Sequence, residues 1–485
     1  MITSTSSAPS TSRQTAATPR RTRKSAMKTA AVAAVAAVAA LGATAVNAAP
    51  FEPPDGQVLF GMWFDPADPY FDTPVQVNER LGFNVPVFQL AQAIPRPAFN
   101  WTTGAGGPAP ERLIEQSGTD AAVFLTVYPE PNGFDGVTTA DYEELGKQIS
   151  DYQSTYNRTT FLRFAPEMQG TWMSYGMQPT MFLQQWVEMY NTVKSIAPDT
   201  IIVWAPNTPQ GYPYGQQGAQ FSALSVEDQN LLDTNNNGRL DAGDDSLAPY
   251  YPGDQYVDWI GLSVYYKGIP SDVRNNEQAP GYCAQVISGT NPADNANITN
   301  FYDTYCAQKP DKACMFAEAA AAYHVNDTTS TTTEEELQQA WLLDCVVNPT
   351  FYEEFPRMKM YMHFEHEKPE SANDGSIDMR DFRITNNTAV LEVLKGDLSS
   401  AGTLFSWGNP RATPTSISSA GAPAATNSDG QSVIQAITAT TRAKPTGFPS
   451  LFGLTSDGSQ RAEFIELGVM LAAGVVGAWS VMRVL

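Results

Sequence analysis

Eight short apolar runs alternate with helical patterns along most of this chain, and this alternation is the feature that most constrains its fold. The apolar runs fall at residues 58–63, 84–90, 121–128, 160–165, 201–206, 257–265, 314–318 and 358–364. Helical patterns lie between them at residues 73–81, 110–116, 139–152, 179–196 and 333–346, and a last one follows at 388–394. Strands that alternate with helices form parallel sheets, and eight such strands are the number that closes into a barrel. We therefore predict an α/β chain with the (β/α)8 TIM-barrel fold.

An open, doubly wound sheet is the alternative arrangement of the same elements. Its dinucleotide-binding form carries a Gly-x-Gly-x-x-Gly sequence after the first strand, and no such sequence follows residues 58–63. The chain has 485 residues, of which 42% are hydrophobic, so it can bury the core of one large barrel. We expect this barrel at residues 49–398.

The N-terminal segment has the composition of a secretory signal peptide. Five basic residues precede an Ala/Val-rich run that closes with Val46-Asn47-Ala48; they are Arg20, Arg21, Arg23, Lys24 and Lys28. A basic region, an apolar region and a small-residue cleavage site in this order are typical of signal peptides. We predict a signal peptide at residues 1–48, cut near Ala48. Asn-x-Ser/Thr sequons agree with a secreted glycoprotein.

The C-terminal part differs in composition from the predicted barrel. Residues 411–446 are rich in Ser, Thr, Ala and Pro, which is typical of an unfolded, O-glycosylated stalk. Small residues at 456–458, a polar spacer and an apolar tail at 467–481 follow, in the order of a GPI-anchor signal. We predict a stalk at residues 399–458 and a GPI-anchor signal at 459–485. A membrane-spanning hydrophobic tail is the alternative for the last segment, although its apolar run is short for a bilayer.

Two glutamates stand at the ends of predicted strands. Glu167 follows the apolar run at 160–165, and Glu318 ends the run at 314–318. Because reactive side chains of a TIM barrel gather at the C-terminal ends of its strands, we expect both carboxyl groups at one barrel mouth. Such a pair is what glycoside hydrolysis requires, because one group donates a proton and the other attacks the anomeric carbon or activates water.

Aromatic side chains at the same strand ends would provide platforms for sugar rings. Tyr128, Trp172, Trp204 and Tyr265 are candidates, although ordinary packing is the commoner role of any one such residue. Arg163 is a charged residue inside a predicted strand, which is costly to bury unless it has a partner. Together these residues indicate a sugar-binding cleft.

Three stretches resemble glycoside hydrolase family 26, a family of retaining enzymes in clan A. They are Arg163-Phe-Ala-Pro-Glu167-Met-Gln-Gly-Thr-Trp172, Ile202-Val-Trp-Ala-Pro-Asn207, and residues 251–261, which contain a Tyr-Pro-Gly-Asp sequence. The resemblance covers residues 58–395. It implies that Glu167 is the acid/base and Glu318 the nucleophile. It also implies that Arg163, Trp172 and Tyr265 bind sugar, and we place Asn207, Trp204 and Tyr128 with them.

The sequence also departs from the family pattern. Pro166 stands where the family has His before the acid/base, and Ser263 stands where it has Asp. No tryptophan follows the eighth apolar run, where His363-Phe-Glu-His366 is found instead. We predict a secreted, surface-anchored endo-β-mannanase-like hydrolase that acts on a neutral polysaccharide such as β-1,4-mannan. β-Glucan or xylan as substrate stays open, and so does a catalytically silent carbohydrate-binding cell-wall protein.

The net charge of −22 argues against nucleic acid as a partner. We expect a monomer with a polysaccharide substrate, located outside the cell at its surface or wall, and held at the membrane only through the C-terminal anchor. The three histidines, His324, His363 and His366, lack the spacing of a zinc site, so we expect no catalytic cofactor.

A structural calcium ion is expected between the fifth and sixth strands. Residues 233–244, Asp-Thr-Asn-Asn-Asn-Gly-Arg-Leu-Asp-Ala-Gly-Asp, match the pattern of an EF-hand loop. The predicted ligands are the side chains of Asp233, Asn235, Asn237, Asp241 and Asp244, with the main chain of Arg239. A polar surface turn is the alternative.

Four cysteines can form two disulfides in an oxidising compartment. Of the three pairings, we expect Cys314 with Cys345 and Cys283 with Cys306.

Overall fold

The structure is a computed structural model that describes residues 48–66, 70, 72–96, 110–214, 219–269, 271–290, 299–372 and 374–411. Residues 1–47 of the predicted signal peptide, residues 412–458 of the predicted stalk and the predicted anchor at 459–485 lie outside these residues, so those three assignments stay predictions. Within the described part of the chain, none of the helices has the length and apolar character that a bilayer crossing requires.

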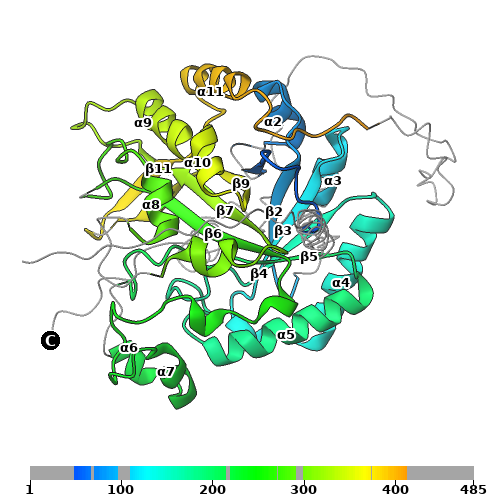
Figure 1. The fold of residues 1–485 in the computed structure, drawn as a ribbon, viewed down its shortest axis with the longest axis vertical. Helices are drawn as coiled ribbons and strands as arrows, with labels where there is room; N and C mark the ends of the chain where they lie inside the picture. The colour runs from blue at the N-terminus through cyan, green and yellow to red at the C-terminus, as the bar shows by residue number, and fades with distance from the viewer. Residues whose placement is uncertain are drawn as a thin grey trace, which may run out of the picture. The chain divides into compact units, whose positions relative to one another are not determined.

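Eight parallel strands form a closed barrel in the order β1-β2-β3-β4-β5-β6-β7-β9 (Figure 1). They are β1 Leu59–Phe64, β2 Val87–Ala93, β3 Ala122–Tyr128, β4 Thr160–Phe164, β5 Ile201–Trp204, β6 Trp259–Tyr266, β7 Ala313–Ala321 and β9 Met358–Glu365. The last strand pairs in parallel with the first, and this pairing closes the ring. The predicted TIM barrel is confirmed.

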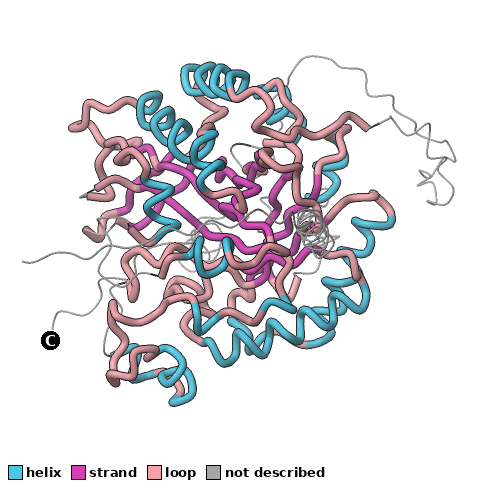
Figure 2. Tube along the Cα trace, in the orientation of Figure 1, coloured by secondary structure: helices cyan, strands magenta, loops and turns pink. Residues whose placement is uncertain are grey.

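Helices and short helical turns follow the strands and surround the barrel (Figure 2). The α-helices are α2 Pro74–Leu81, α3 Pro110–Gln116, α4 Thr139–Ser154, α5 Pro179–Ile196, α6 Ala219–Ala223, α7 Val226–Leu232, α8 Tyr282–Ser288, α9 Glu334–Trp341, α10 Pro349–Glu354 and α11 Thr388–Ser400. Three elements are 3-10 helices, namely η1 Gly133–Gly136, η2 Ala248–Tyr250 and η3 Asp254–Tyr256. Two more are π-helices, namely η4 Tyr302–Ala307 and η5 Leu342–Val346. The helix predicted at 333–346 is therefore α9 followed by the π-helical η5.

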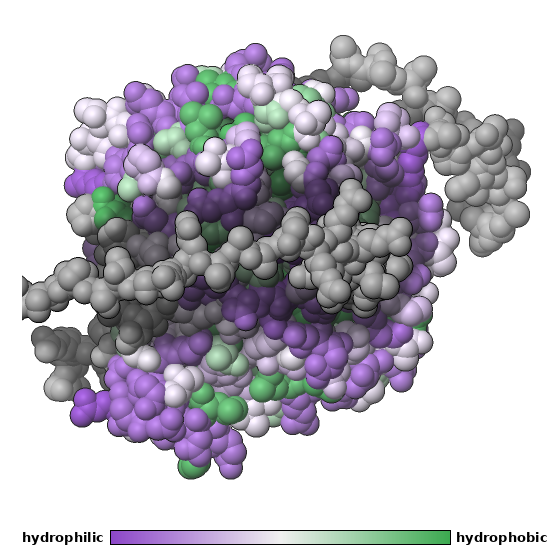
Figure 3. All heavy atoms as spheres, viewed as in Figure 1, coloured by the Kyte–Doolittle hydropathy of each residue, from purple (hydrophilic) through white to green (hydrophobic). Residues whose placement is uncertain are grey.

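The strands alternate between an inner and an outer core, as their pleat requires. Along β4, Phe161 belongs to the cluster inside the barrel, whereas Leu162 and Phe164 belong to the cluster between the barrel and its helices. Other large members of the inner cluster are Phe124, Trp259, Met315 and Met360. The inside of the barrel is thus a packed core. A functional site therefore belongs at the mouth of the barrel, where the C-terminal ends of the strands lie. The face of the molecule shown in Figure 3 is mostly hydrophilic, as expected for an acidic chain.

A small antiparallel sheet in the order β10-β11-β8 follows the C-terminal ends of β7 and β9. It consists of β8 Tyr323–His324, β10 Glu367–Ser371 and β11 Ile377–Asp381. The sequence did not predict it, because Glu-Lys-Pro-Glu-Ser in β10 has none of the apolar alternation that marks a strand. Its position places polar side chains beside the barrel mouth.

Residues after α11 return to the opposite end of the barrel. Phe405 forms a bridge with Val58, and its ring lies 6.0 Å from that of Phe60. Trp407 stacks on Phe83 with the ring centroids 4.5 Å apart. Residues 399–411, which the sequence placed in the stalk, therefore contact the barrel, whereas the predicted division of the chain into domains stays a prediction.

The two disulfides join Cys283 to Cys345 and Cys306 to Cys314, with Cα–Cα distances of 5.4 and 5.9 Å. The predicted pairing is wrong. Cys306 lies near the end of η4, and the short connection at residues 308–312 brings it to Cys314 near the start of β7. The helix that carries Cys345 lies outside the barrel beside α8, which carries Cys283.

Candidate active site

The turn after β4 places Glu167 at the barrel mouth. Ala165 and Glu167 both have left-handed backbone conformations, with φ of 42° and 56°, on either side of Pro166. The Glu167 amide donates to the carbonyl oxygen of Ala205 after β5, at 3.0 Å. Left-handed backbone is uncommon outside glycine and tends to cluster where a side chain must be held for function. The turn holds the Glu167 side chain at 1% exposure.

A β-bulge brings Glu318 to the same place. Leu262 of β6 pairs with Phe316, but the next residue, Ser263, pairs with Glu318, so Ala317 is an extra residue in β7. The extra residue shifts the alternation, because Phe316 packs outside the barrel whereas Glu318 reaches Arg163 on the inside. Ala317 fits because its neighbour is Gly261, where an added Cβ would lie 2.6 Å from the Ala317 Cβ.

Arg163 connects the inner faces of three strands. Its Nη1 donates to Glu318 Oε2 at 2.5 Å, and its Nη2 donates to Ser263 Oγ at 2.7 Å. Burial alone would lower the pKa of Arg163, but the negative charge of Glu318 raises it above its ordinary value. The guanidinium is thus a permanent positive charge, with no exposed surface, that faces the Glu318 carboxylate.

Glu167 has a different environment. Its Oε2 accepts the indole N–H of Trp172 at 2.8 Å, whereas its Oε1 is buried and has no hydrogen-bond partner among the residues that the structure describes. Burial and the negative charge of Glu318 raise the pKa of Glu167 above its ordinary value, although Arg163 opposes this shift. The site therefore contains one carboxylate that is paired with a cation and one carboxyl group that favours its protonated form.

Two tyrosines face the carboxyl pair. Tyr265 donates its hydroxyl to Glu318 Oε1, and its ring packs against Phe364 and Phe382 at centroid distances of 5.7 and 5.5 Å. Burial and then the charge of Glu318 raise the pKa of both Tyr265 and Tyr128 well above the ordinary tyrosine value. Both hydroxyl groups therefore stay protonated and can donate hydrogen bonds.

Asn207 is held beside this group by its main chain. Its N–H donates to Gln169 Oε1 at 3.2 Å and its carbonyl accepts from Gln169 Nε2 at 2.7 Å, while a bridge joins it to Ser263. Its side-chain Nδ2 is buried and has no partner within the described ranges, so it can still donate a hydrogen bond. Gln169 was not predicted, although it lies two residues after Glu167.

Trp204 does not belong to the site, which corrects the prediction. Its side chain packs on the outside of β5, where its Nε1 donates to the carbonyl of Tyr250 at 3.0 Å. Its ring lies about 5 Å from those of Tyr251 and Tyr305. Val203, not Trp204, points into the barrel, so the position at the strand end did not determine the direction of the side chain.

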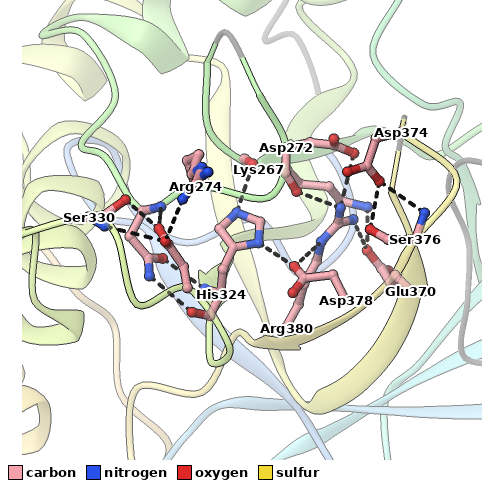
Figure 4. A network of polar contacts seen from close by, with 12 residues as sticks. Lys267, Asp272, Arg274, His324, Ser330, Glu370, Asp374, Ser376, Asp378 and Arg380 are labelled. Atoms are coloured by element: carbon pink, nitrogen blue, oxygen red, sulfur yellow. Dashed lines mark hydrogen bonds and ion pairs between the residues drawn. The ribbon is translucent and has the colours of Figure 1, made fainter.

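A buried polar network lies between the loop after β6 and the small sheet, and forms one wall of this region (Figure 4). Glu370 pairs with Lys267 at 2.7 Å and with Arg380 at 2.6 Å, and Arg380 continues to Asp272 at 3.0 Å. Burial lowers the pKa of Lys267 to about 8, although Glu370 opposes this shift. The Lys267 ammonium also lies 5.4 Å from the ring centroid of Tyr265, which connects the wall to the site.

The three histidines contact groups of this wall and of the barrel mouth. His324 contacts Asp378 and the carbonyl of Lys267, and His363 Nε2 contacts the carbonyl of Phe382 at 2.9 Å. His366 stacks on Phe364 at 4.3 Å. Within the described ranges, one group of side chains has the spacing of metal ligands, namely Cys283, Asp344 and Cys345, but its cysteines form a disulfide.

The predicted calcium loop folds around its own polar side chains. Asp233 accepts the main-chain N–H groups of Asn237 and Gly238 at 2.8 and 2.7 Å, and Gly238 has a φ of 78°. Asn237 Nδ2 donates to Asp241 at 2.8 Å, and Asp244 accepts from the N–H groups of Asn235 and Asp241. These side chains offer oxygen atoms, which are the ligands that calcium prefers. They fit a calcium ion when the Asn237 side-chain amide is rotated so that its oxygen, and not its nitrogen, faces Asp241.

No protein-family model and no curated protein matches this chain. Solved structures that resemble it include a double mutant of a Cellulomonas fimi endo-β-1,4-mannanase, 12% identical over 73% of each chain with a TM-score of 0.43. The GH26 domain of a Prevotella bryantii endo-β-mannanase/endo-β-glucanase is 14% identical over 73% of this chain and 91% of that one, with a TM-score of 0.40. A Bacteroides ovatus GH26 β-mannanase is 13% identical over 73% and 90%, also with a TM-score of 0.40. At these values the likeness carries no argument about activity, which must come from the site itself.

Proposed function

We propose that this protein is a retaining glycoside hydrolase that cleaves a β-linked neutral polysaccharide, with β-1,4-mannan as the first substrate to test. The observation that supports this is the opposite environment of two carboxyl groups at one barrel mouth. Glu318 faces Arg163 at 2.5 Å, whereas the pKa of Glu167 is raised by burial and by the charge of Glu318. Pairs of carboxyl groups with separated pKa values are the usual acid and nucleophile of glycosidases.

Glu167 is the general acid in this proposal. Because its Oε2 already accepts the Trp172 indole N–H, the proton of the neutral acid belongs on Oε1. No group in the described part of the chain hydrogen-bonds to Oε1, so it is the atom that can donate to the leaving-group oxygen. After bond cleavage the same carboxylate takes a proton from the incoming water.

Glu318 is the nucleophile. Hydrogen bonds from Arg163 and Tyr265 fix its orientation, so that one oxygen attacks the anomeric carbon as the leaving group departs. The glycosyl–enzyme ester is then cleaved by water, which restores the carboxylate and retains the configuration. Asn207 Nδ2 and the hydroxyl group of Tyr128 are the donors that we assign to substrate hydroxyls, the Tyr265 hydroxyl oxygen is an acceptor, and Trp172 is an aromatic contact.

The test is reducing-sugar release from β-mannan, β-glucan and xylan by the protein and by its Glu318→Gln variant. Glu143→Gln, which changes a half-exposed helical glutamate, is the matched control. We expect release from one of these polymers that Glu318→Gln abolishes and Glu143→Gln retains. Binding to a polysaccharide without release, unchanged by Glu318→Gln, would instead favour the carbohydrate-binding protein.

We also propose that a structural calcium ion binds the loop at 233–244, and that the chain is secreted, GPI-anchored and monomeric. The oxygen donor set of the loop supports the first proposal, and the composition of the two ends supports the anchor. Release of the protein from intact cells by a phosphatidylinositol-specific phospholipase tests the anchor, because a membrane-spanning tail would resist the enzyme.

A further inference from the structure

The segment before β1 closes the N-terminal end of the barrel. The Phe51 ring packs 5.5 Å from the ring of Phe161, and Trp259 Nε1 donates to the carbonyl of Pro50 at 2.8 Å. Phe161 and Trp259 stand at the starts of β4 and β6, with their side chains inside the barrel. Ala49 joins the same inner cluster and is 4% exposed, whereas Ala48 is exposed. The chain thus enters the barrel floor between these two alanines.

The main-chain nitrogen of Ala49 faces a buried carboxylate. It lies 2.9 Å from Glu52 Oε2, and the amide of Glu52 donates back to the Ala49 carbonyl at 3.1 Å. The Glu52 side chain is 4% exposed. Arg357 binds it through Nη1 at 2.7 Å and Nη2 at 3.1 Å, and the Lys359 ammonium lies 3.8 Å away.

We propose that the chain is cut between Ala48 and Ala49, and that the new α-ammonium group of Ala49 forms a buried ion pair with Glu52. Val46 and Ala48 are the small residues that a signal peptidase needs before the cut, and the first buried residue follows directly. Hydrolysis consumes one water and leaves a carboxylate on Ala48 and an ammonium on Ala49. A neutral amide donor thereby becomes a charged donor, which makes a stronger hydrogen bond to a carboxylate.

Removal of the leader and stability of the barrel are then coupled. Ala49 is almost fully buried, so the bond before it is accessible to a peptidase before folding and not after it. The charged groups that face the new ammonium are Glu52 on its own segment and Arg357 and Lys359 at the start of β9. Farther out, exposed Asp55 lies 3.5 Å from Lys359, and Lys312, whose carbonyl accepts from Arg357, pairs with Asp311.

The pH dependence of this ion pair follows from the amine. Pairing with Glu52 favours the charged amine, so its stabilising effect is complete below the ordinary α-amino pKa of about 7.7 to 8.0. The effect is lost as the pH rises above the pKa of the folded state, where the amine becomes neutral.

The experiment uses the full coding sequence, expressed in a secreting eukaryotic host. Mass spectrometry of the N-terminal peptide should find Ala49 as the first residue. A variant with one serine inserted between Ala48 and Ala49 turns the Ala49 nitrogen back into an amide, and the same measurement confirms its new N-terminus. We expect its Tm to be about 1 to 3 °C lower at pH 6 and equal to that of the wild type at pH 9.5.

Glu52→Gln supplies the second arm, with Asp55→Asn as the exposed matched control. In the Glu52→Gln background the insertion should lower the Tm no further, whereas in the Asp55→Asn background it should lower it as in the wild type. A first residue other than Ala49, additive effects of the insertion and Glu52→Gln, or an equal loss at both pH values would each overturn the proposal. If Glu52→Gln does not fold, two measurements still test the proposal. They are the identity of the N-terminal residue and the Tm of the serine-insertion variant at pH 6 and pH 9.5. None of these outcomes depends on the proposed hydrolysis.

Discussion

Arg163 and Glu318 form a buried ion pair, with Nη1 and Oε2 2.5 Å apart, although 155 positions separate them in the chain. The pair sets the charge of the barrel mouth, because Arg163 compensates the charge of Glu318, whereas burial and that same charge raise the pKa of Glu167. The proposed division of work between the two glutamates rests on this asymmetry.

The roles of the glutamates can be separated with substrates that differ in leaving group. Glu167→Gln should lower kcat by about 10²- to 10⁴-fold on polysaccharide. A dinitrophenyl glycoside needs little protonation, so it should still form the glycosyl–enzyme, which accumulates because no base activates water. Added azide needs no base and should restore turnover, with a glycosyl azide of retained configuration as the product. Glu318→Gln should be inactive on every substrate, and azide rescue of this variant with a product of retained configuration would mean that the roles are exchanged.

The raised pKa of Glu167 predicts that replacement of this residue by glutamine makes the folded protein more stable. In the folded state this group favours its protonated form, so its contribution to stability is complete below its unfolded pKa of about 4.3 and is lost as the pH rises through the higher folded pKa. Glu167→Gln should therefore raise the Tm at pH 7 and have less effect at pH 4. The comparison is Glu318→Gln, which leaves Arg163 without its anionic partner and should lower the Tm at pH 7.

The raised pKa of Glu167 should also be visible in the pH profile of activity. The falling limb of kcat/KM at high pH should report the loss of the Glu167 proton. An activated aryl glycoside needs no acid for the first step. With this substrate, the rate at which the glycosyl–enzyme forms should fall much less at high pH. An equally steep limb on both substrates would assign it to another group, such as Lys267, whose pKa is lowered to about 8 by burial.

Trp172 and Trp204 should differ in what their replacement removes. Trp172→Phe deletes the N–H that occupies Glu167 Oε2, so kcat/KM should fall by about ten- to a hundred-fold, which corresponds to the loss of a hydrogen bond to the carboxylate that forms as Glu167 gives up its proton. Trp204→Ala empties a fully buried position outside the barrel and should lower the free energy of unfolding by about 3–5 kcal/mol. Denaturant unfolding and kinetics of both variants check this contrast, and the reverse pattern would contradict the position of the site.

Calcium removal should affect stability and not chemistry. EDTA should lower the Tm, and added calcium should restore it, because an ion that binds only the folded state stabilises it by mass action. Asp233→Ala should have a lower Tm and no response to EDTA, whereas Asn236→Ala, which changes a loop residue outside the predicted ligand set, should still respond. A Tm of the wild type that EDTA does not change would leave the loop as a polar turn.

The sequence predicted the barrel because alternation of strands and helices is a local pattern that repeats eight times. It also predicted that Glu167 and Glu318 meet, because TIM-barrel strands end at one mouth. It could not predict the direction of Trp204, which depends on the phase of a four-residue strand, or the disulfide pairing, which depends on how helices pack outside the barrel. The wall around Lys267 and Glu370 was missed because hydrogen bonds between polar side chains leave no periodic signal in a sequence.

The extra residue in β7 has a consequence for how mutations at this site will be read. Ala317 contributes no polar atom, and a scan that substitutes one residue at a time would record at this position only a need for small size, matched by Gly261. Deletion of Ala317 would keep both glutamates and every hydrogen-bond donor, and Glu318 would then follow outward-facing Phe316 directly, so a regular strand would still point it inward opposite Ser263. Such a deletion removes only the local distortion of the bulge, so a library that varies codon number, and not only codon identity, is needed to measure what the bulge itself contributes to the site.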